Sequence, residues 1–228
     1  MKMYGATDIG LVRATNQDNF YIDKSVKWAV VADGMGGHNG GETASSMAVE
    51  EIKKSMSQGV GLKECIANAN TVVYNHSIVN PELMGMGTTI VLCEVIGCKV
   101  NVAHVGDSRA YHYSKGKLKQ ITKDHSIVQQ LIDSGTITEE QAKYHPQRNL
   151  ITRAVGTEKY ILVDCNSCEL NENDYILVCS DGLSSYVDKD EIIDILENTK
   201  TSEVAAKLVE AANNSGGKDN VTVVIIKA

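Results

Sequence analysis

Residues 88–113, TTIVLCEVIGCKVNVAHVGDSRAYHY, decide the fold class of this chain. Apolar and β-branched residues fill three short runs, at 89–95, 99–105 and 109–113, and a turn that contains glycine separates each run from the next. Short apolar runs between glycine turns predict consecutive antiparallel strands. We therefore expect a β-meander here that ends at the turn of residues 114–117.

Segments with helical and with strand-like patterns flank this meander. Before it, residues 1–37 have the texture of strands and turns, and apolar residues at helical spacing predict helices at 42–56 and 62–79. After it, we expect helices at 124–134, 139–143, 190–197 and 202–212, and strands at 160–168, 175–179 and 221–226. Antiparallel strands interrupted by helix pairs indicate an α+β fold of two packed sheets with helices outside, rather than a doubly wound sheet.

Composition restricts the class of protein. A chain of 228 residues with 43% hydrophobic residues can bury a substantial core, and with two prolines and no linker we expect a single domain over residues 1–228. The net charge of −7, without a basic patch, argues against nucleic acid as a partner. No apolar run has the length of a signal peptide or a membrane span, so we expect a cytoplasmic protein without membrane insertion.

The chain has six cysteines, and Cys165 and Cys168 stand at the spacing of a redox pair or a zinc knuckle. Neither a second cysteine pair nor a histidine pair follows at the distance that a zinc site needs. Several cysteines instead interrupt apolar runs, where a reduced thiol acts as a small hydrophobic group. We expect buried or idle thiols.

Aspartates stand where apolar runs begin or end. Asp33 follows residues 29–32, Asp181 follows residues 176–180, and Asp219 shortly precedes the last predicted strand. A single Asp-Gly pair is more typical of a turn. Several carboxylates about 4 Å apart, however, repel by roughly 4 kcal/mol per pair at an effective dielectric constant of 20, so they converge only around cations or with raised pKa values. Oxygen ligands without histidine or thiolate indicate Mg²⁺ or Mn²⁺.

Two further patterns concern phosphate. Residues 36–41 have the glycine spacing of a phosphate-binding loop, but Glu42 stands where that loop requires lysine, so the pattern argues against nucleotide binding. Arg13 precedes Asp18 by five residues, and the planar fork of arginine matches phosphate oxygens. Taken alone, Arg13 fits a surface Arg-Asp pair equally well.

Seven short motifs occur in the order in which the metal-dependent protein Ser/Thr phosphatases of type 2C carry them. They are RATNQD at 13–18, ADGMGG at 32–37, GTT at 87–89, VGDSR at 105–109, ITRAVG at 151–156, SDGL at 180–183 and DNVT at 219–222. The chain resembles the bacterial type of this family from about residue 4 to residue 226. The resemblance implies a central antiparallel β-sandwich flanked by helix pairs, in α-β-β-α layers.

The resemblance also implies a centre of two Mn²⁺ or Mg²⁺ ions and a third, weaker one. The ligands that it implies are Asp33, Asp181 and Asp219 for the first ion, Asp18, Asp33 and the Gly34 carbonyl for the second, and Asp107 with Asp181 for the third. Asp33 would then bridge the first two ions. For Asp107 a structural role is the alternative.

The chemistry implied is in-line attack of a metal-bridging hydroxide on phosphoserine or phosphothreonine, while Arg13 holds the phosphate oxygens. Met35 stands where eukaryotic members have a histidine, so metal-bound water, His38 or His145 would protonate the leaving group, and we favour water. Residues 124–155 fit the flap that borders the active site in bacterial members, or else an ordinary helical insertion.

Three functions remain open. We favour an active phosphatase, a monomer that acts on phosphorylated proteins and reverses a bacterial Ser/Thr kinase, because aspartate fills all the ligand positions. An inactive scaffold comes second, and a metal-dependent hydrolase of another phosphoester third.

Overall fold

The structure is a computed structural model that describes residues 1–228, apart from the side chains of residues 37–39. Its strands are β1 (Lys2–Asp8), β2 (Asn19–Asp23), β3 (Trp28–Ala32), β4 (Gly34–Met35), β5 (Gly87–Thr88), β6 (Ile90–Ile96), β7 (Lys99–Val105), β8 (Arg109–Ser114), β9 (Lys117–Gln120), β10 (Asp164–Glu169), β11 (Tyr175–Cys179) and β12 (Val221–Lys227). Its helices are α1 (Gly37–Ser57), α2 (Leu62–Val79), the 3₁₀ turn η1 (Pro81–Leu83), α3 (Ile127–Asp133), α4 (Glu139–Lys143), α5 (Asp181–Ser184), α6 (Lys189–Asn198) and α7 (Val204–Asn214).

Two five-stranded antiparallel sheets form the centre of the molecule. The strand orders are β1-β12-β11-β8-β9 in one sheet and β10-β7-β6-β3-β2 in the other, and β4 pairs with β5 beside them. The predicted three-strand meander is therefore wrong for its third strand. β6 and β7 pair as expected, but β8 pairs with β9 and β11 in the opposite sheet, because the turn at residues 106–108 carries the chain across the sandwich.

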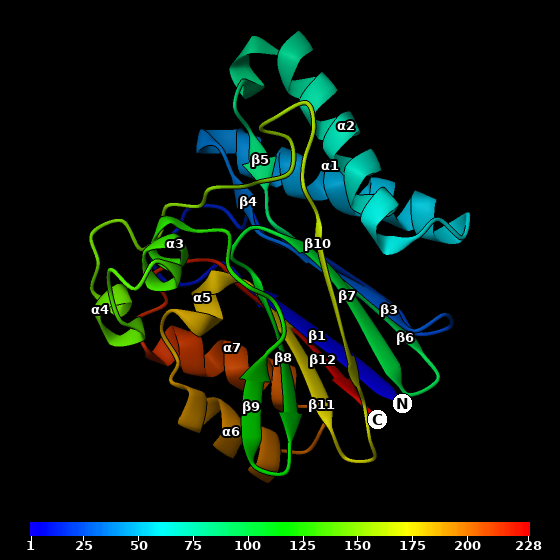
Figure 1. The fold of residues 1–228 in the computed structure, drawn as a ribbon, viewed down its shortest axis with the longest axis vertical. Helices are drawn as coiled ribbons and strands as arrows, with labels where there is room; N and C mark the ends of the chain where they lie inside the picture. The colour runs from blue at the N-terminus through cyan, green and yellow to red at the C-terminus, as the bar shows by residue number, and fades with distance from the viewer.

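The two sheets and the helices outside them form four layers (Figure 1). Side chains that alternate along each strand join these layers. Trp28, Val30 and Ala32 of β3 face α1 and α2, whereas Ala29 and Val31 face the other sheet. This is the period-two pattern that a strand with both faces covered requires. On the far side, α5, α6 and α7 pack on the opposite sheet through a second apolar cluster. The α+β fold with its α-β-β-α layers is confirmed.

Four elements differ from the sequence prediction. The strand predicted at 160–168 begins only at Asp164, because Ile161 and Val163 pack against the α1 and α2 side of the core without entering a sheet. β9 and α5 were not predicted; β9 has a single apolar residue and α5 has four residues. The helix predicted from residue 42 begins at Gly37.

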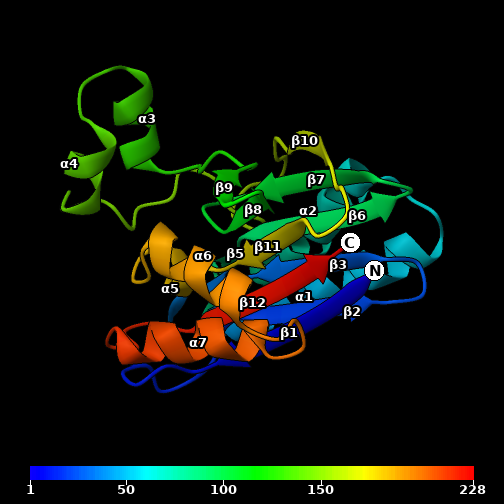
Figure 2. The same cartoon turned by 90° about the horizontal axis from the view of Figure 1, so that it is seen from below.

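α3 and α4 belong to a segment that projects away from both sheets (Figure 2). Its two ends are tied together at its root, where Ser126 and Ile151 form an antiparallel bridge and the Ile127 amide donates to the Leu150 carbonyl. No residue of α3 is buried, and Ala142 is the buried residue of α4. We call residues 124–155 the flap.

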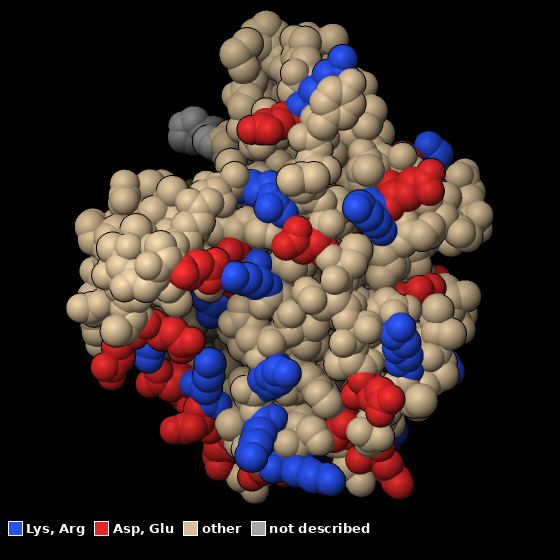
Figure 3. Space-filling view, in the orientation of Figure 1, with Lys and Arg blue, Asp and Glu red and all other residues tan. Residues whose placement is uncertain are grey.

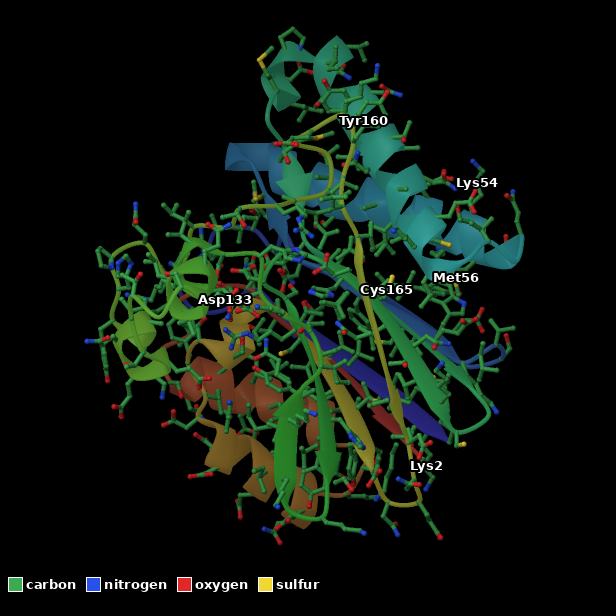
Figure 4. All side chains as sticks on the ribbon, viewed as in Figure 1. Lys2, Lys54, Met56, Asp133, Tyr160 and Cys165 are labelled. Atoms are coloured by element: carbon green, nitrogen blue, oxygen red, sulfur yellow. The ribbon has the colours of Figure 1, made fainter. Side chains whose placement is uncertain are left out.

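The surface charge, the helices and the cysteine pair can be compared with the expectations drawn from composition. On the face shown in Figure 3, basic side chains are interspersed with acidic ones. In the described part of the chain, none of the helices combines the length and the hydropathy that a bilayer-spanning segment requires. Cys165 lies on β10, within the outermost strand of its sheet (Figure 4). Because residues three apart in a strand point to opposite faces, the sulfurs of Cys165 and Cys168 do not form a redox pair.

Candidate metal centre

The predicted aspartates meet at one edge of the sandwich because of strand pairing. β11 and β12 are antiparallel, with Cys179 opposite Val223, so the end of β11 lies beside the start of β12. Asp181 follows the first strand and Asp219 precedes the second. A β-carbon on Gly182 would overlap the carbonyl oxygen of Asn220, so only glycine permits this approach of the two chain segments.

The opposite sheet supplies the other aspartates. Asp33 directly follows β3, Asp18 directly precedes the paired strand β2, and Asp107 lies in the crossover from β7 to β8. Asp33 and Asp107 line a cavity of about 570 Å³, and Asp18 lies behind it. Its lining includes the predicted site residues Arg13, Asp33, Gly34, Asp107, Asp181 and Asp219, together with Asn149 and Ile151 of the flap.

The threonines of the GTT motif hold Asp33 in place. The Asp33 amide donates to Thr89 Oγ1 at 3.0 Å, and Thr88 Oγ1 donates to the Asp33 carbonyl at 2.9 Å. Thr89 Oγ1 also lies 2.7 Å from Ser108 Oγ, next to Asp107. Sequence motifs far apart in the chain thus form one hydrogen-bond network, which leaves the Asp33 carboxylate free to face the cavity.

Asp18 lies behind the cavity and is held from one side only. Ser180 Oγ donates to Asp18 Oδ2 at 2.8 Å, and the same hydroxyl accepts from the Thr222 amide at 2.9 Å. Asp18 Oδ1 is buried and has no hydrogen-bond partner among the described residues. A buried carboxylate oxygen without a partner is costly unless a cation or an added proton compensates it.

Arg13 stands at the edge of the same cavity. Its Nη2 lies 2.7 Å from Asp219 Oδ2, and about half of the arginine side chain is exposed. This is the Arg-carboxylate contact that the sequence allowed for Arg13, but its partner is Asp219 rather than Asp18. The guanidinium is therefore within reach both of the aspartates and of a molecule that enters the cavity.

Asp18, Asp33, Asp107 and Asp181 resist ionisation. Burial raises the pKa of Asp18 to about 7, the pKa of Asp107 to about 8 and the pKa of Asp181 to about 6. Burial, followed by the charges of the four other aspartates, raises the pKa of Asp33 well above its usual range. The negative potential at the site therefore favours either protons or cations.

The residues present fit divalent cations. The donors are carboxylate and carbonyl oxygens, the donor set of Mg²⁺ and Mn²⁺, and the unpartnered Asp18 oxygen needs a compensating charge. Five aspartates carry −5 when ionised, and the one arginine that lines the cavity cannot balance them.

Two predicted proton donors receive no support as site residues. The side chain of His38 lies outside the described residues. His145 lies on the flap, where its Nδ1 accepts from the Gln147 amide, and it is not among the described residues that line the cavity.

The sequence prediction missed a second polar cluster, at the root of the flap. His104, His125 and Asp164 place their ligand-type atoms within 4.8 Å of one another. Arg153 Nη1 lies 2.8 Å from Asp164 Oδ1 and 3.0 Å from His125 Nε2. A fixed positive charge between these groups opposes a metal ion there. The residues lie 21, 39 and 60 positions apart in sequence, so no spacing motif indicates them.

Comparison with known proteins decides the family. The family model described as protein phosphatase 2C matches residues 12–215, which include every predicted aspartate except Asp219. The chain belongs to the protein phosphatase 2C family. This confirms the resemblance of the motifs and makes the chain a protein phosphatase.

The phosphatase 2C relatives agree in sequence and in fold. A serine/threonine phosphatase, stp, of Listeria monocytogenes is 36% identical over 235 residues, which cover 97% of this chain and 93% of that protein. The crystal structure of the serine/threonine phosphatase PstP/Ppp of Mycobacterium tuberculosis superposes with a TM-score of 0.92 at 36% identity, covering 100% of this chain and 99% of that one. A PstP catalytic domain solved with two manganese ions has a TM-score of 0.88 at 36% identity and covers 98% of this chain and 96% of that one.

Proposed function

We propose that the aspartate-lined cavity is the active site of a protein serine/threonine phosphatase that depends on Mn²⁺ or Mg²⁺. The observation that carries this proposal is that Asp33, Asp107, Asp181 and Asp219 line one cavity, with Asp18 buried beside them and Arg13 at the cavity edge. The family and the manganese complex of a relative support the same assignment.

In this proposal Asp33, Asp181 and Asp219 hold one ion, and Asp18, Asp33 and the Gly34 carbonyl hold another. Asp107 with Asp181 would hold a third, weaker ion. Bound ions would supply an activated water as nucleophile and would neutralise charge that develops on the phosphoryl group. The chain itself contributes rigid placement: the Thr88 and Thr89 bonds orient Asp33, and Ser180 orients Asp18.

Arg13 is the residue that we assign to the phosphate. Its guanidinium can donate two parallel hydrogen bonds to phosphate oxygens, a geometry that lysine cannot reproduce. The contact with Asp219 holds the guanidinium at the cavity edge, so a phosphoryl group that enters there meets a positive charge already in place.

We assign substrate selection to the flap. Asn149 and Ile151 line the cavity, whereas α3 and α4 stand away from the sheets. A segment in this position can contact the polypeptide that carries the phosphorylated residue without touching the reacting atoms. Residues 1–228 would act as one catalytic domain with this flap at the border of its active site.

The cellular setting follows from the activity. A phosphatase acting on phosphoproteins reverses a kinase, and we propose that its counterpart is a Ser/Thr kinase. We further propose that the chain works as a cytoplasmic monomer. Light scattering of the purified chain and dephosphorylation of a kinase-treated extract test these two points separately.

The test of the proposed function is hydrolysis of a phosphothreonine peptide by the purified chain with EDTA, Mg²⁺ or Mn²⁺. We expect activity only with metal, and we expect Asp181→Asn to abolish it while circular dichroism shows an intact fold. Activity in EDTA would contradict the proposal. Folded wild-type protein that is inactive with every metal would favour a scaffold, and faster hydrolysis of nucleotides than of phosphopeptides would favour the other phosphoester hydrolase.

A further inference from the structure

His125 lies at the root of the flap, and the proposed reaction does not use it. It is 7% exposed and directly precedes Ser126, whose bridge to Ile151 closes the flap. The His125 carbonyl accepts from the Thr152 amide at 2.7 Å, so His125 bonds to the segment by which the chain returns from the flap to its root.

His125 also holds the turn that presents Asp107. Its Nδ1 accepts from the Gly106 amide at 3.0 Å, and its own amide donates to the Gly106 carbonyl at 3.0 Å. One residue thus satisfies both backbone polar groups of Gly106, 19 positions earlier in the chain. Since Asp107 is the next residue, its backbone is fixed by this pair of bonds.

Gly106 is confined from the other side as well. Its φ of +101° lies in the left-handed region, and a β-carbon there would lie 2.6 Å from Thr89 Cγ2. Thr89 is the residue that accepts from the Asp33 amide. The contacts therefore run without a gap from the flap root through His125 and Gly106 to Asp107, and through Thr89 to Asp33.

The remaining ring nitrogen has its own partner. Because Nδ1 accepts a hydrogen bond, the neutral ring carries its proton on Nε2, which lies 3.3 Å from Asp164 Oδ2. Arg153 Nη1 lies 3.0 Å from the same nitrogen, but it donates to Asp164 Oδ1 and to the Leu162 carbonyl. The ring stacks on His104 with centroids 4.9 Å apart. Burial lowers the pKa of His125, which keeps the ring in the neutral form that the bond from Gly106 requires.

We propose that His125 is a positioning residue that couples the flap to the metal centre, through the hydrogen bond that its Nδ1 accepts from Gly106. The coupling rests on the proposed function for its catalytic consequence, but not for the bond itself. Loosening this bond would loosen Asp107, and with it the binding of the weaker ion, without changing how the phosphoryl group is held.

Two amide variants of His125 separate the roles of its two ring nitrogens. In His125→Asn, Oδ1 takes the place of Nδ1 and can accept from Gly106; in His125→Gln, the amide nitrogen takes the place of Nε2 and that acceptor is lost. Both variants lose the stacking on His104, so their melting temperatures should fall alike. His112→Gln is the matched control, because His112 lies on β8, outside the flap, and its Nε2, like that of His125, lies near a carboxylate oxygen, at 3.0 Å from Oδ2 of Asp174.

We expect hydrogen exchange at the Gly106 amide of metal-free protein to be about tenfold faster in His125→Gln and in His125→Ala, and unchanged in His125→Asn. In the same two variants, the Mn²⁺ concentration at which the weaker site is half-occupied should rise about tenfold, as measured by calorimetry. The KM for a small aryl phosphate should stay constant. The His112→Gln control should match the wild type throughout.

The proposal is overturned if His125→Gln matches the wild type in Gly106 amide exchange and in Mn²⁺ binding. It is also overturned if His125→Asn is as impaired in these two measurements as His125→Ala. Its failure can be told apart from failure of the proposed function. If the wild type binds no Mn²⁺, the proposed function fails, whereas the exchange of the Gly106 amide still tests the bond.

Discussion

Asp18 shows at a single residue why this site requires cations. One of its oxygens accepts from Ser180, and the other is buried without a partner among the described residues. Besides the nearby hydroxyl groups of Ser180 and Thr222, the fold gives this carboxylate almost no compensation, and burial raises its pKa from 3.8 to about 7. If Asp18 holds an ion as we propose, stability is given up at this position for function.

The shift at Asp18 predicts the pH dependence of the metal-free protein. The pKa is higher in the folded than in the unfolded chain, so the stabilisation from binding this proton is present below pH 4 and is lost as pH rises through about 7. In EDTA at pH 8, Asp18→Asn should therefore melt higher than the wild type, by roughly 5 °C, and the gap should vanish near pH 4. The exposed Glu172→Gln serves as control. Equal melting temperatures at pH 8 would refute the assignment.

Arg13 supports a prediction at the same scale. Without its fork, kcat/KM for a phosphopeptide should fall about tenfold to a hundredfold in Arg13→Ala, and Arg13→Lys should recover only part of the loss. Lys207→Ala on α7 is the control for loss of a positive charge. Unchanged turnover in Arg13→Ala would show that another group holds the phosphate.

Among the elements, long apolar ones could be predicted from sequence and short or polar ones could not. α2 was predicted over residues 62–79 and lies at Leu62–Val79, because eighteen residues repeat one helical pattern. β9 was missed because Lys117, Lys119 and Gln120 conceal an edge strand with one apolar residue, Leu118. The aspartates were predictable from motifs, but His125 was not, since its partner is a backbone amide.

The flap is an element whose removal the structure allows. Ser126 and Ile151 are paired antiparallel, so an Asn-Gly turn can replace residues 127–150 and preserve both His125 and Thr152. We expect this variant to keep most of its activity on a small aryl phosphate and to lose selectivity among phosphorylated proteins. Equal losses of activity on the aryl phosphate and on phosphorylated proteins would show that the flap does not select substrates. A flap of equal length, with a scrambled sequence that lacks arginine, is the control for loss of the segment itself.

At the scale of the whole molecule, the proposed metal centre joins the two sheets. Asp18 and Asp33 flank β2 and β3 of one sheet, Asp181 and Asp219 flank β11 and β12 of the other, and Asp107 lies in the crossover. An ion bound by both pairs would hold the sandwich together at one edge. Binding to the folded state alone stabilises that state.

The metal should therefore raise the melting temperature of the entire sandwich. At a Mn²⁺ concentration one hundred times the dissociation constant, the gain is about 2.7 kcal/mol, or roughly 5–10 °C for a chain of this size. The gain should disappear in Asp181→Asn. A shift that persists in this variant would place the ions elsewhere.

The most direct test of the metal centre is anomalous diffraction at the manganese edge from crystals grown with Mn²⁺. We predict two strong peaks in the cavity between Asp33 and the other aspartates, with a weaker peak beside Asp107. Two results would contradict the proposed metal centre. One is a set of peaks confined to the cluster of His104, His125 and Asp164, and the other is a cavity without any peak in protein that Mn²⁺ activates.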